Sequence, residues 1–258
     1  MGNVWIAALG MVFIFFMTAM GAAVVYFFKK EIPVKLNAFF FGFASGVMIA
    51  ASVWSLLLPA IEQSQAKWGT VSLVGVVLGV VIGGATLVFL DKRISLLQKT
   101  DTDNQKGKMF RVFIAVTLHN IPEGLAVGFA FGGASLLGTP AAYFSALGLA
   151  IGIGIQNFPE GAAISLSVKN VVKSNTNAFL WGAGSGVVEP FFAIVGYFLA
   201  ARIAILQPWL LSFSAGAMLF VSAQDLIPDS RLPSSPRLGA WGVLLGFVLM
   251  MALDVLLG

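Results

Sequence analysis

The sequence predicts an all-α integral membrane protein with eight transmembrane helices, arranged as a single polytopic domain over residues 1–258. Of the 258 residues, 59% are hydrophobic and only 10% are charged, whereas soluble domains usually carry about 25% charged residues. A soluble fold of this length could not bury so much apolar surface. The 29 glycines agree with this class, because membrane helices approach one another closely through small residues.

Apolar runs and the polar segments between them define the eight spans. A helix needs about 20 predominantly apolar residues to cross the hydrocarbon core. In chain order, the runs that meet this need are 4–28, 38–60, 70–90, 112–134, 141–168, 178–201, 208–228 and 239–257. The segments that separate them are KKEIPVKLN, EQSQAKWG, DKRISLLQKTDTDNQKGKMFR (91–111), GGASLLGTP, KNVVKSNTN, the stretch around 202–208, and DSRLPSSPR. The first run lacks the basic flank of a signal peptide, so we expect it to be retained.

Lysine and arginine are distributed unevenly between the two ends of these spans. The loops after the first, third, fifth and seventh spans contain 13 of these residues, and the other side has only Lys67 and Arg202. Because cytoplasmic loops are enriched in Lys and Arg, we expect the 91–111 loop in the cytoplasm and both termini outside or in the periplasm. The expected location is the cell membrane, with the bacterial inner membrane as the favoured case.

Two sequence patterns recur on helices of opposite direction. The fourth and fifth spans share N-x-P-E-G at an offset of 37 residues, and FASGVMIAAS at 43–52 in the second is similar to FSAGAMLFVS at 213–222 in the seventh. The same pattern on oppositely directed helices indicates inverted repeats, here helices 1–3 and 6–8 around a central pair formed by helices 4 and 5. In transporters with such repeats, substrates bind near the middle of the bilayer.

The most informative stretches are HNIPEG at 119–124 and QNFPEG at 156–161. Each motif puts a carboxylate one helical turn after an imidazole or amide, so that both side chains lie on one helix face. The proline in each motif lacks a backbone donor and leaves the carbonyl of Leu118 or Ile155 free. Polar side chains and a free carbonyl at membrane depth, repeated on two helices, indicate a cation site.

Three carboxylates, those of Glu123, Glu160 and Glu189, lie well inside predicted spans. A central acidic residue costs roughly 2.5–3.5 kcal/mol to insert, and the fourth, fifth and sixth spans contain no Lys or Arg to pair with these groups. The compensating charge is therefore a proton or a bound cation. The alternative without a ligand is a set of protonated, hydrogen-bonded glutamic acids that hold helices together.

The chain's single histidine, His119, lies one turn from Glu123 and next to Asn120. Imidazole suits Zn, Fe and Ni, whereas carboxylate and amide oxygens suit harder ions such as Mn. This mixture favours a borderline divalent metal, with Zn²⁺ first. Gln156 and Asn157 are weaker indicators, because neutral amides cost less to bury than charged groups.

Other residues indicate less. Met48 is more often a core residue than a thioether ligand, and Asp225 and Asp229 near the cytoplasmic end of the seventh span are candidates for an exit route. The absence of cysteine excludes thiolate ligands. HNIPEG also lacks the second histidine of H-E-x-x-H, so a zinc protease is not indicated.

Together these motifs resemble those of the ZIP (Zrt/Irt-like protein) family of divalent metal transporters. The resemblance rests on HNIPEG in the fourth helix, N-x-P-E-G in the fifth, GSGVVEP in the sixth, SGVMIAAS in the second and AGAMLFVSAQDLIPD in the seventh. It covers nearly the whole chain and is greatest for the branch typical of bacteria. It implies a transporter, not an enzyme, whose substrate is chiefly Zn²⁺, often with Fe²⁺, Mn²⁺ or Cd²⁺, moved toward the cytoplasm.

The resemblance further implies a two-metal centre between helices 4 and 5. One metal would be held by His119, Glu123, Gln156 and Glu160, with Met48 nearby, and the second by Asn120, Asn157, Glu160 and Glu189, with Glu123 and Glu160 bridging the two. It also implies that helices 1, 4, 5 and 6 move as a block against the others, and that members commonly form homodimers. Many members have histidine where Gln156 stands and some have aspartate where Asn157 stands, so weaker binding or broader selectivity is expected here.

From the residues alone, two other classes remain open. A proton- or sodium-coupled carrier of an organic solute could use the same buried carboxylates. An intramembrane metal-dependent enzyme would need an open coordination position for water. The expected partners are a divalent metal ion and the lipid bilayer; the net charge of +4 reflects cytoplasmic loops and is no indication of nucleic-acid binding.

Overall fold

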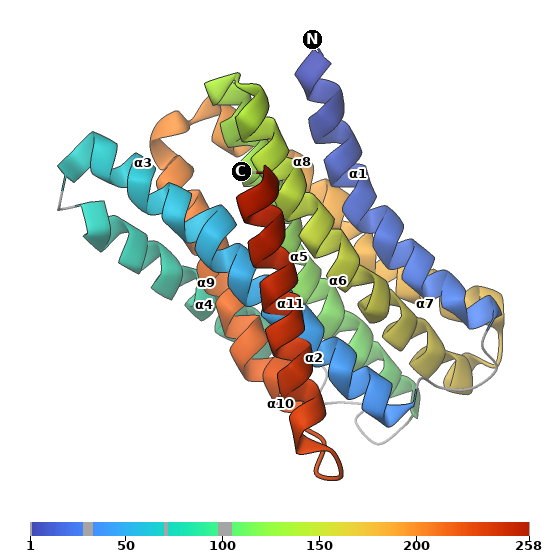
Figure 1. Cartoon of the computed structure of the whole chain (residues 1–258). Coiled ribbons are helices and arrows are strands. Elements are labelled where there is room, and N and C mark those ends of the chain that lie inside the picture. Colours follow the sequence, from blue (N-terminus) through green and yellow to red (C-terminus); the bar gives the residue numbers. More distant parts are fainter. Residues whose placement is uncertain (1, 28–32, 70–71, 98–104, 258) are drawn as a thin grey trace.

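Long helices with roughly aligned axes make up the computed structural model (Figure 1), which describes residues 2–27, 33–69, 72–97 and 105–257. In chain order the elements are α1 (Gly2–Ala22), η1 (Ala23–Tyr26), α2 (Val34–Ala51), η2 (Ser52–Leu57), α3 (Leu58–Trp68), α4 (Ser72–Leu97), α5 (Gln105–Leu137), α6 (Pro140–Val172), α7 (Asn175–Gly186), α8 (Val188–Arg202), η4 (Ala204–Leu206), α9 (Gln207–Val221), η5 (Ser222–Leu226), α10 (Ile227–Asp229) and α11 (Pro236–Leu257). Two of the short elements, η2 and η5, are π-helical turns. These ranges contain no β-strand, which confirms the all-α class.

Seven segments of the described chain are long and apolar enough to cross a membrane. They are Val4–Tyr26, Val34–Ala66, Ser72–Leu90, Pro140–Leu166, Asn175–Arg202, Gln207–Asp229 and Pro236–Leu257. Each corresponds to one predicted span, so the multi-pass membrane class is confirmed. The predicted fourth span, 112–134, corresponds to α5, which is not among the seven. At 1.5 Å per residue, the 33 residues of α5 extend about 50 Å.

The helices continue beyond the boundaries that hydropathy predicted. α3 runs through most of EQSQAKWG to Trp68, α4 extends to Leu97, and α5 begins at Gln105. The loop predicted at 91–111 is therefore wrong in extent, and its residues 98–104 lie outside the described residues. Apolar runs mark the hydrocarbon core, whereas a helix keeps its internal backbone hydrogen bonds through the polar interface, so its ends do not coincide with the ends of the apolar run.

A connection of two residues joins α5 to α6, the helices that carry the two motifs. Gly138 has φ of 68°, a left-handed conformation that glycine adopts without strain. The Thr139 hydroxyl then accepts a hydrogen bond from the backbone N–H of Ala142, and Pro140 occupies the first turn of α6, where its missing N–H has no intrahelical partner to lose. This short turn makes α5 and α6 antiparallel neighbours and brings the motifs to a similar depth.

The most extensive packing among the described helices lies in four pairs. α1 packs against α6, α5 against α8, α2 against α11, and α4 against α9. In Figure 1 the two marked ends of the chain lie toward the upper end of the bundle, and the turn between α10 and α11 lies at the lower end.

The second and seventh predicted spans have the same irregularity. α2 passes into a π turn at Ser52 and α9 at Ser222, which are the last residues of the two similar decapeptides. The Ser52 hydroxyl donates to the Met48 carbonyl at 2.7 Å, and the Ser222 hydroxyl donates to the Met218 carbonyl at 2.9 Å. Because π turns inside α-helices are rare and often lie at functional sites, a matching pair indicates a shared structural role.

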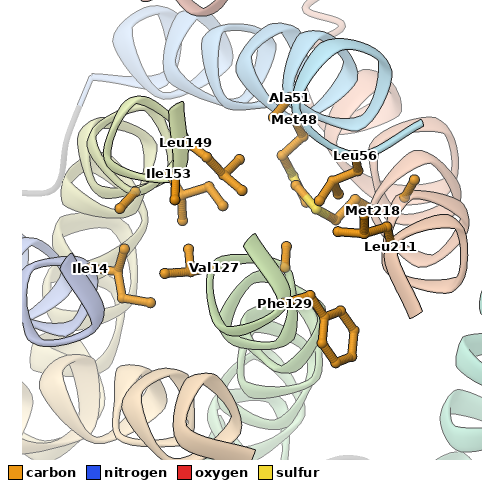
Figure 2. Packing of buried hydrophobic residues seen from close by; sticks show 14 of the residues in the cluster. Ile14, Met48, Ala51, Leu56, Val127, Phe129, Leu149, Ile153, Leu211 and Met218 are labelled. Atoms are coloured by element: carbon orange, nitrogen blue, oxygen red, sulfur yellow. The ribbon is translucent and has the colours of Figure 1, made fainter. Parts of the chain in front are cut away.

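Apolar side chains fill the space between the helices. Figure 2 shows residues from five helices and one π turn, namely Ile14, Met48, Ala51, Leu56, Val127, Phe129, Leu149, Ile153, Leu211 and Met218, directed into one cluster. Large apolar side chains also cover the outside, for example Trp5 (72% exposed) and Leu256 (79% exposed). Because apolar side chains lie both inside the bundle and on its outside, the residues that indicate a binding site are the polar ones in the interior.

Candidate metal site

Both motifs place their polar side chains in the interior of the bundle, between α5 and α6. Asn120, Glu123, Gln156 and Asn157 are at most 1% exposed, and Glu160 is 8% exposed. A polar or charged side chain with so little access to solvent needs partners inside the protein.

The last glycine of each motif allows a neighbouring helix to approach. A Cβ atom on Gly124 would clash with the backbone oxygen of Glu189 in α8, and one on Gly161 would clash with the backbone oxygen of Thr18 in α1. Glycine is therefore needed at both positions for these backbones to come so close. The result is that α8 and α1 each bring a polar side chain to the edge of the motif pair.

Hydrogen bonds connect the side chains of this group. Gln156 Nε2 donates to Glu123 Oε1 at 2.6 Å, which joins α6 to α5. Asn120 Nδ2 donates to Glu189 Oε1 at 2.9 Å, and the Thr18 hydroxyl donates to the same oxygen at 2.8 Å. Each of these two glutamates therefore receives hydrogen bonds on one carboxylate oxygen only.

Several atoms of the group have no partner. In the described part of the chain, nine buried side-chain polar atoms lack a hydrogen bond, and seven of them belong to this group. They are Asn120 Oδ1, Glu123 Oε2, Gln156 Oε1, Asn157 Oδ1 and Nδ2, Glu160 Oε2 and Glu189 Oε2. Because buried polar atoms are nearly always paired, this concentration needs a physical cause. Six of the seven are carboxylate or amide oxygens, which are the atoms that bind a cation.

His119 lies at the edge of the group rather than inside it. Its Nε2 is 3.1 Å from Asp225 Oδ2 of η5, and 16% of its side chain is exposed. His119 and Glu160 line a cavity of about 320 Å³, together with Asn37, Asp225 and Asp229. This cavity extends from the two motif residues toward the end of the bundle where α2 begins and α10 ends.

The carboxylate and histidine side chains of the group lie too far apart to bind a metal ion by themselves. Among the described residues, no three His, Asp or Glu side chains come close enough together to hold a metal ion. The unpaired amide oxygens of Asn120, Gln156 and Asn157 lie in the same group, and amide oxygen is also a metal ligand. A site here therefore requires amide ligands beside the carboxylates.

The sequence model of the family described as ZIP zinc transporter matches residues 108–254, which is more than half of the 258 residues. This chain belongs to the ZIP zinc transporter family.

Individual ZIP relatives match over most of their length. The zinc transporter ZIP11 of Homo sapiens is 32% identical over 338 aligned residues, covering 99% of this chain and 98% of that protein. The zinc transporter GufA of Myxococcus xanthus is 33% identical, covering 80% and 81%, and the zinc transporter ZIPB of Bordetella bronchiseptica is 30% identical, covering 99% and 82%. The predicted resemblance is thus confirmed: this ZIP chain is a membrane transporter, not an enzyme.

The fold brings most of the predicted site residues of this ZIP chain together. His119 lies at the edge of the polar group, and Met48 lies outside it. Glu189 of α8 contacts the first motif through Asn120 of α5. Met48 is fully buried within the apolar cluster, beside Leu56 and Met218 (Figure 2). It does not line the cavity that contains His119 and Glu160.

Two residues that contact the polar group, Thr18 and Ser185, were not predicted. Thr18 binds Glu189, and Ser185 accepts a hydrogen bond from Asn120 through its backbone oxygen. A backbone acceptor leaves no trace in a sequence. Thr18 could have been found, because it is a polar residue well inside the apolar first span.

Proposed function

We propose that this ZIP chain carries Zn²⁺ across the membrane through the polar group formed by HNIPEG, QNFPEG and Glu189. The observation that supports the proposal is the set of seven buried, unpaired polar atoms in that group. Bound Zn²⁺ would satisfy the oxygens and balance the carboxylate charge. The organic-solute carrier finds no support, since the family and the relatives named above are all zinc transporters.

The proposed ligands divide into two sets, and Glu123 and Glu160 bridge the two ions. His119, Glu123, Gln156 and Glu160 hold the first ion, with Met48 near it, and Asn120, Asn157, Glu160 and Glu189 hold the second. The unpaired oxygens of Gln156, Asn157 and Glu189 support their proposed role as ligands. Fe²⁺, Mn²⁺ and Cd²⁺ remain predicted alternative substrates, because carboxylate and amide oxygens also suit harder ions.

In the proposed architecture α5 is the fourth of eight spans. Spans one to three (α1 to α4) and spans six to eight (α7 to α11) form an inverted repeat. The repeat exchanges α1 with α8, α2 with α9, α4 with α11 and α5 with α6. Under this exchange the α1–α6 contact corresponds to the α8–α5 contact, and the α2–α11 contact corresponds to the α9–α4 contact. The matching π turns at Ser52 and Ser222 and the matching contacts of Gly124 and Gly161 support the same relation.

The proposed path leads out through the cavity beside His119. That cavity reaches the end of the bundle that has most of the Lys and Arg residues, which the charge distribution assigns to the cytoplasm. A second cavity of about 160 Å³ lies between α3, α5, α6 and α9 and is lined by Gln63 and Gln207, but by no motif residue. In the proposed orientation the site would connect to the cytoplasmic side, as expected for a transporter about to release its ion inward. Both termini would then lie outside, and homodimer formation remains a prediction.

Uptake into liposomes tests this function. The purified chain is reconstituted, ⁶⁵Zn²⁺ uptake is measured, and Glu123→Ala is compared with Glu62→Ala, which removes an exposed carboxylate outside the site. We expect zinc uptake by the wild type and Glu62→Ala, and none above empty liposomes by Glu123→Ala. Wild-type rates from Glu123→Ala would disprove the proposed site.

A further inference from the structure

Glu189 receives both of its hydrogen bonds on the same oxygen. Thr18 Oγ1 and Asn120 Nδ2 donate to Oε1 at 2.8 and 2.9 Å, whereas Oε2 is buried and has no partner. The carboxylate thus has one oxygen fixed by two donors from two different helices. The other oxygen is left for a ligand.

The donors themselves are fixed. Asn120 Nδ2 has two protons, and its second hydrogen bond goes to the backbone oxygen of Ser185 at 3.1 Å. Thr18 has a single hydroxyl proton, and its contact with Glu189 at 2.8 Å is shorter than its contact with the Ile14 carbonyl at 3.3 Å. The shorter of these two contacts is the stronger hydrogen bond.

Two glycines leave the space in which Thr18 and Glu189 meet. A Cβ atom on Gly186 would lie 2.8 Å from Cγ2 of Thr18 and 2.9 Å from Oε1 of Glu189, both closer than real Cβ contacts. A Cβ atom on Gly161 would clash with the Thr18 backbone oxygen. Thr18 is therefore held against α6 on one side and against the start of α8 on the other, with its hydroxyl toward Glu189.

The proposed inverted repeat has different residues at two equivalent positions. Gly124 contacts the Glu189 backbone oxygen and Gly161 contacts that of Thr18, so Thr18 occupies in α1 the place that Glu189 occupies in α8. One half of the repeat supplies a carboxylate, and the other supplies a hydroxyl that donates to it. An ion at this level is thus attracted toward the α8 side.

We propose that Thr18 is a positioning residue for zinc binding: with Asn120 it holds Oε1 of Glu189, so that Oε2 is presented to the ion. This inference rests on the proposed function, because it assigns a role toward the same zinc site. Loss of a group that orients a metal ligand typically lowers metal affinity about 10–100-fold. The hydroxyl, and not the methyl group or the volume of Thr18, is the part that acts.

The test measures zinc binding by calorimetry and ⁶⁵Zn²⁺ uptake for Thr18→Val, Thr18→Ser and Glu189→Gln. Thr86→Val in α4 is the matched control, since its hydroxyl donates only to Ile82 of its own helix. Thr18→Val keeps the shape but removes the donor, so we expect its affinity to fall about tenfold with little change in maximal rate at saturating zinc. Thr18→Ser, which restores the hydroxyl, should return the affinity to within about twofold.

A double variant separates positioning from general damage. If Thr18 acts through Glu189, Thr18→Val combined with Glu189→Gln binds zinc no more weakly than Glu189→Gln alone. Unchanged affinity in Thr18→Val, no rescue by Thr18→Ser, or additive losses in the double variant would each overturn the inference. None of these outcomes affects the proposed function, which fails separately if Glu123→Ala transports zinc.

Discussion

Gln156 is the residue that most distinguishes the two motifs, because it occupies in α6 the position that His119 occupies in α5. Its Nε2 donates to Glu123 Oε1 at 2.6 Å, and its Oε1 has no partner. The amide therefore serves Glu123 with one end and is available to an ion with the other. His119, in contrast, contacts Asp225 at the cavity. The two motifs thus offer donor atoms of different softness at equivalent positions.

Replacing Gln156 with histidine should strengthen zinc binding. Imidazole is a better ligand than an amide oxygen for Zn²⁺, whereas Mn²⁺ prefers oxygen. We expect Gln156→His to bind Zn²⁺ about tenfold more tightly, which corresponds to about 1.4 kcal/mol, and to lose relative affinity for Mn²⁺. Competition of Mn²⁺ with ⁶⁵Zn²⁺ in both proteins measures this, and an unchanged Zn²⁺/Mn²⁺ ratio would show that Gln156 is not a ligand.

The sequence allowed candidate site residues to be recognised, but it did not predict which of them contact each other. Glu123, Glu160 and Glu189 could be recognised, because unpaired charge inside an apolar span is costly wherever it occurs. The link between His119 and Asp225 could not, since these residues are 106 positions apart and meet only after α5 and η5 pack together. Amides such as Asn157 gave a weak signal because a neutral group is tolerated at many buried positions.

At the level of elements, the site depends on close approach of α5 to α8 and of α6 to α1. Gly124 and Gly161 make these approaches, and in both cases the contacted atom is a backbone oxygen, which cannot move aside as a flexible side chain can. Membrane helices often pack through small residues in this way.

Adding a methyl group at Gly124 should separate α5 from α8 and disturb Glu189. We expect Gly124→Ala to lose about 1–3 kcal/mol of stability through overpacking and most of its zinc uptake. Gly84→Ala in α4 is the control, since its Cβ would meet its nearest neighbour at 3.6 Å, an ordinary contact. Thermal unfolding in detergent and uptake measure the two effects. Equal stability of both variants would contradict this packing.

Hydropathy located the helices but not their ends or irregularities. Seven predicted spans have matching apolar segments, because the apolar run needed to cross a bilayer is itself the signal. The extension of α4 to Leu97 and the start of α5 at Gln105 involve polar residues, for which hydropathy carries no information. The π turns at Ser52 and Ser222 were also not predicted, because the side chains around them are compatible with a regular α-helix.

For the whole molecule, the proposed orientation follows from the loops rather than from the site. The turn between α10 and α11 and the end of α3 lie at opposite ends of the bundle (Figure 1). The chain has no cysteine, so a single introduced thiol reports the side on which it lies.

Thiol labelling tests this orientation in intact cells. Ser234 and Ala66 are both exposed, and we expect a membrane-impermeant maleimide to label Ala66→Cys from outside and Ser234→Cys only after the membrane is opened. The reverse pattern would invert the molecule and with it the proposed direction of transport. The predicted topology has five membrane spans between the two positions, which puts them on opposite sides. Labelling of both positions from outside would contradict this topology.

Transport should also depend on pH. Metal ligands must be deprotonated to bind, and protons therefore compete with zinc for the glutamates and for His119. Because binding sites are lost as protons are added, we expect zinc uptake by liposomes at fixed free Zn²⁺ to fall as the pH is lowered from 7.5 to 5.5. A rate that rises steadily toward acid would contradict this account and indicate that proton movement drives transport.

The most direct test of the central claim is the zinc content of the purified protein after dialysis. Glu160 contributes to both proposed ligand sets and lies where the buried group meets the cavity. We predict stoichiometric zinc in the wild type and in Glu62→Ala, and its loss in Glu160→Ala with the helical content retained. Zinc retained in full by Glu160→Ala, or no zinc in the wild type at micromolar concentrations, would contradict the assignment of the ion to the paired motifs.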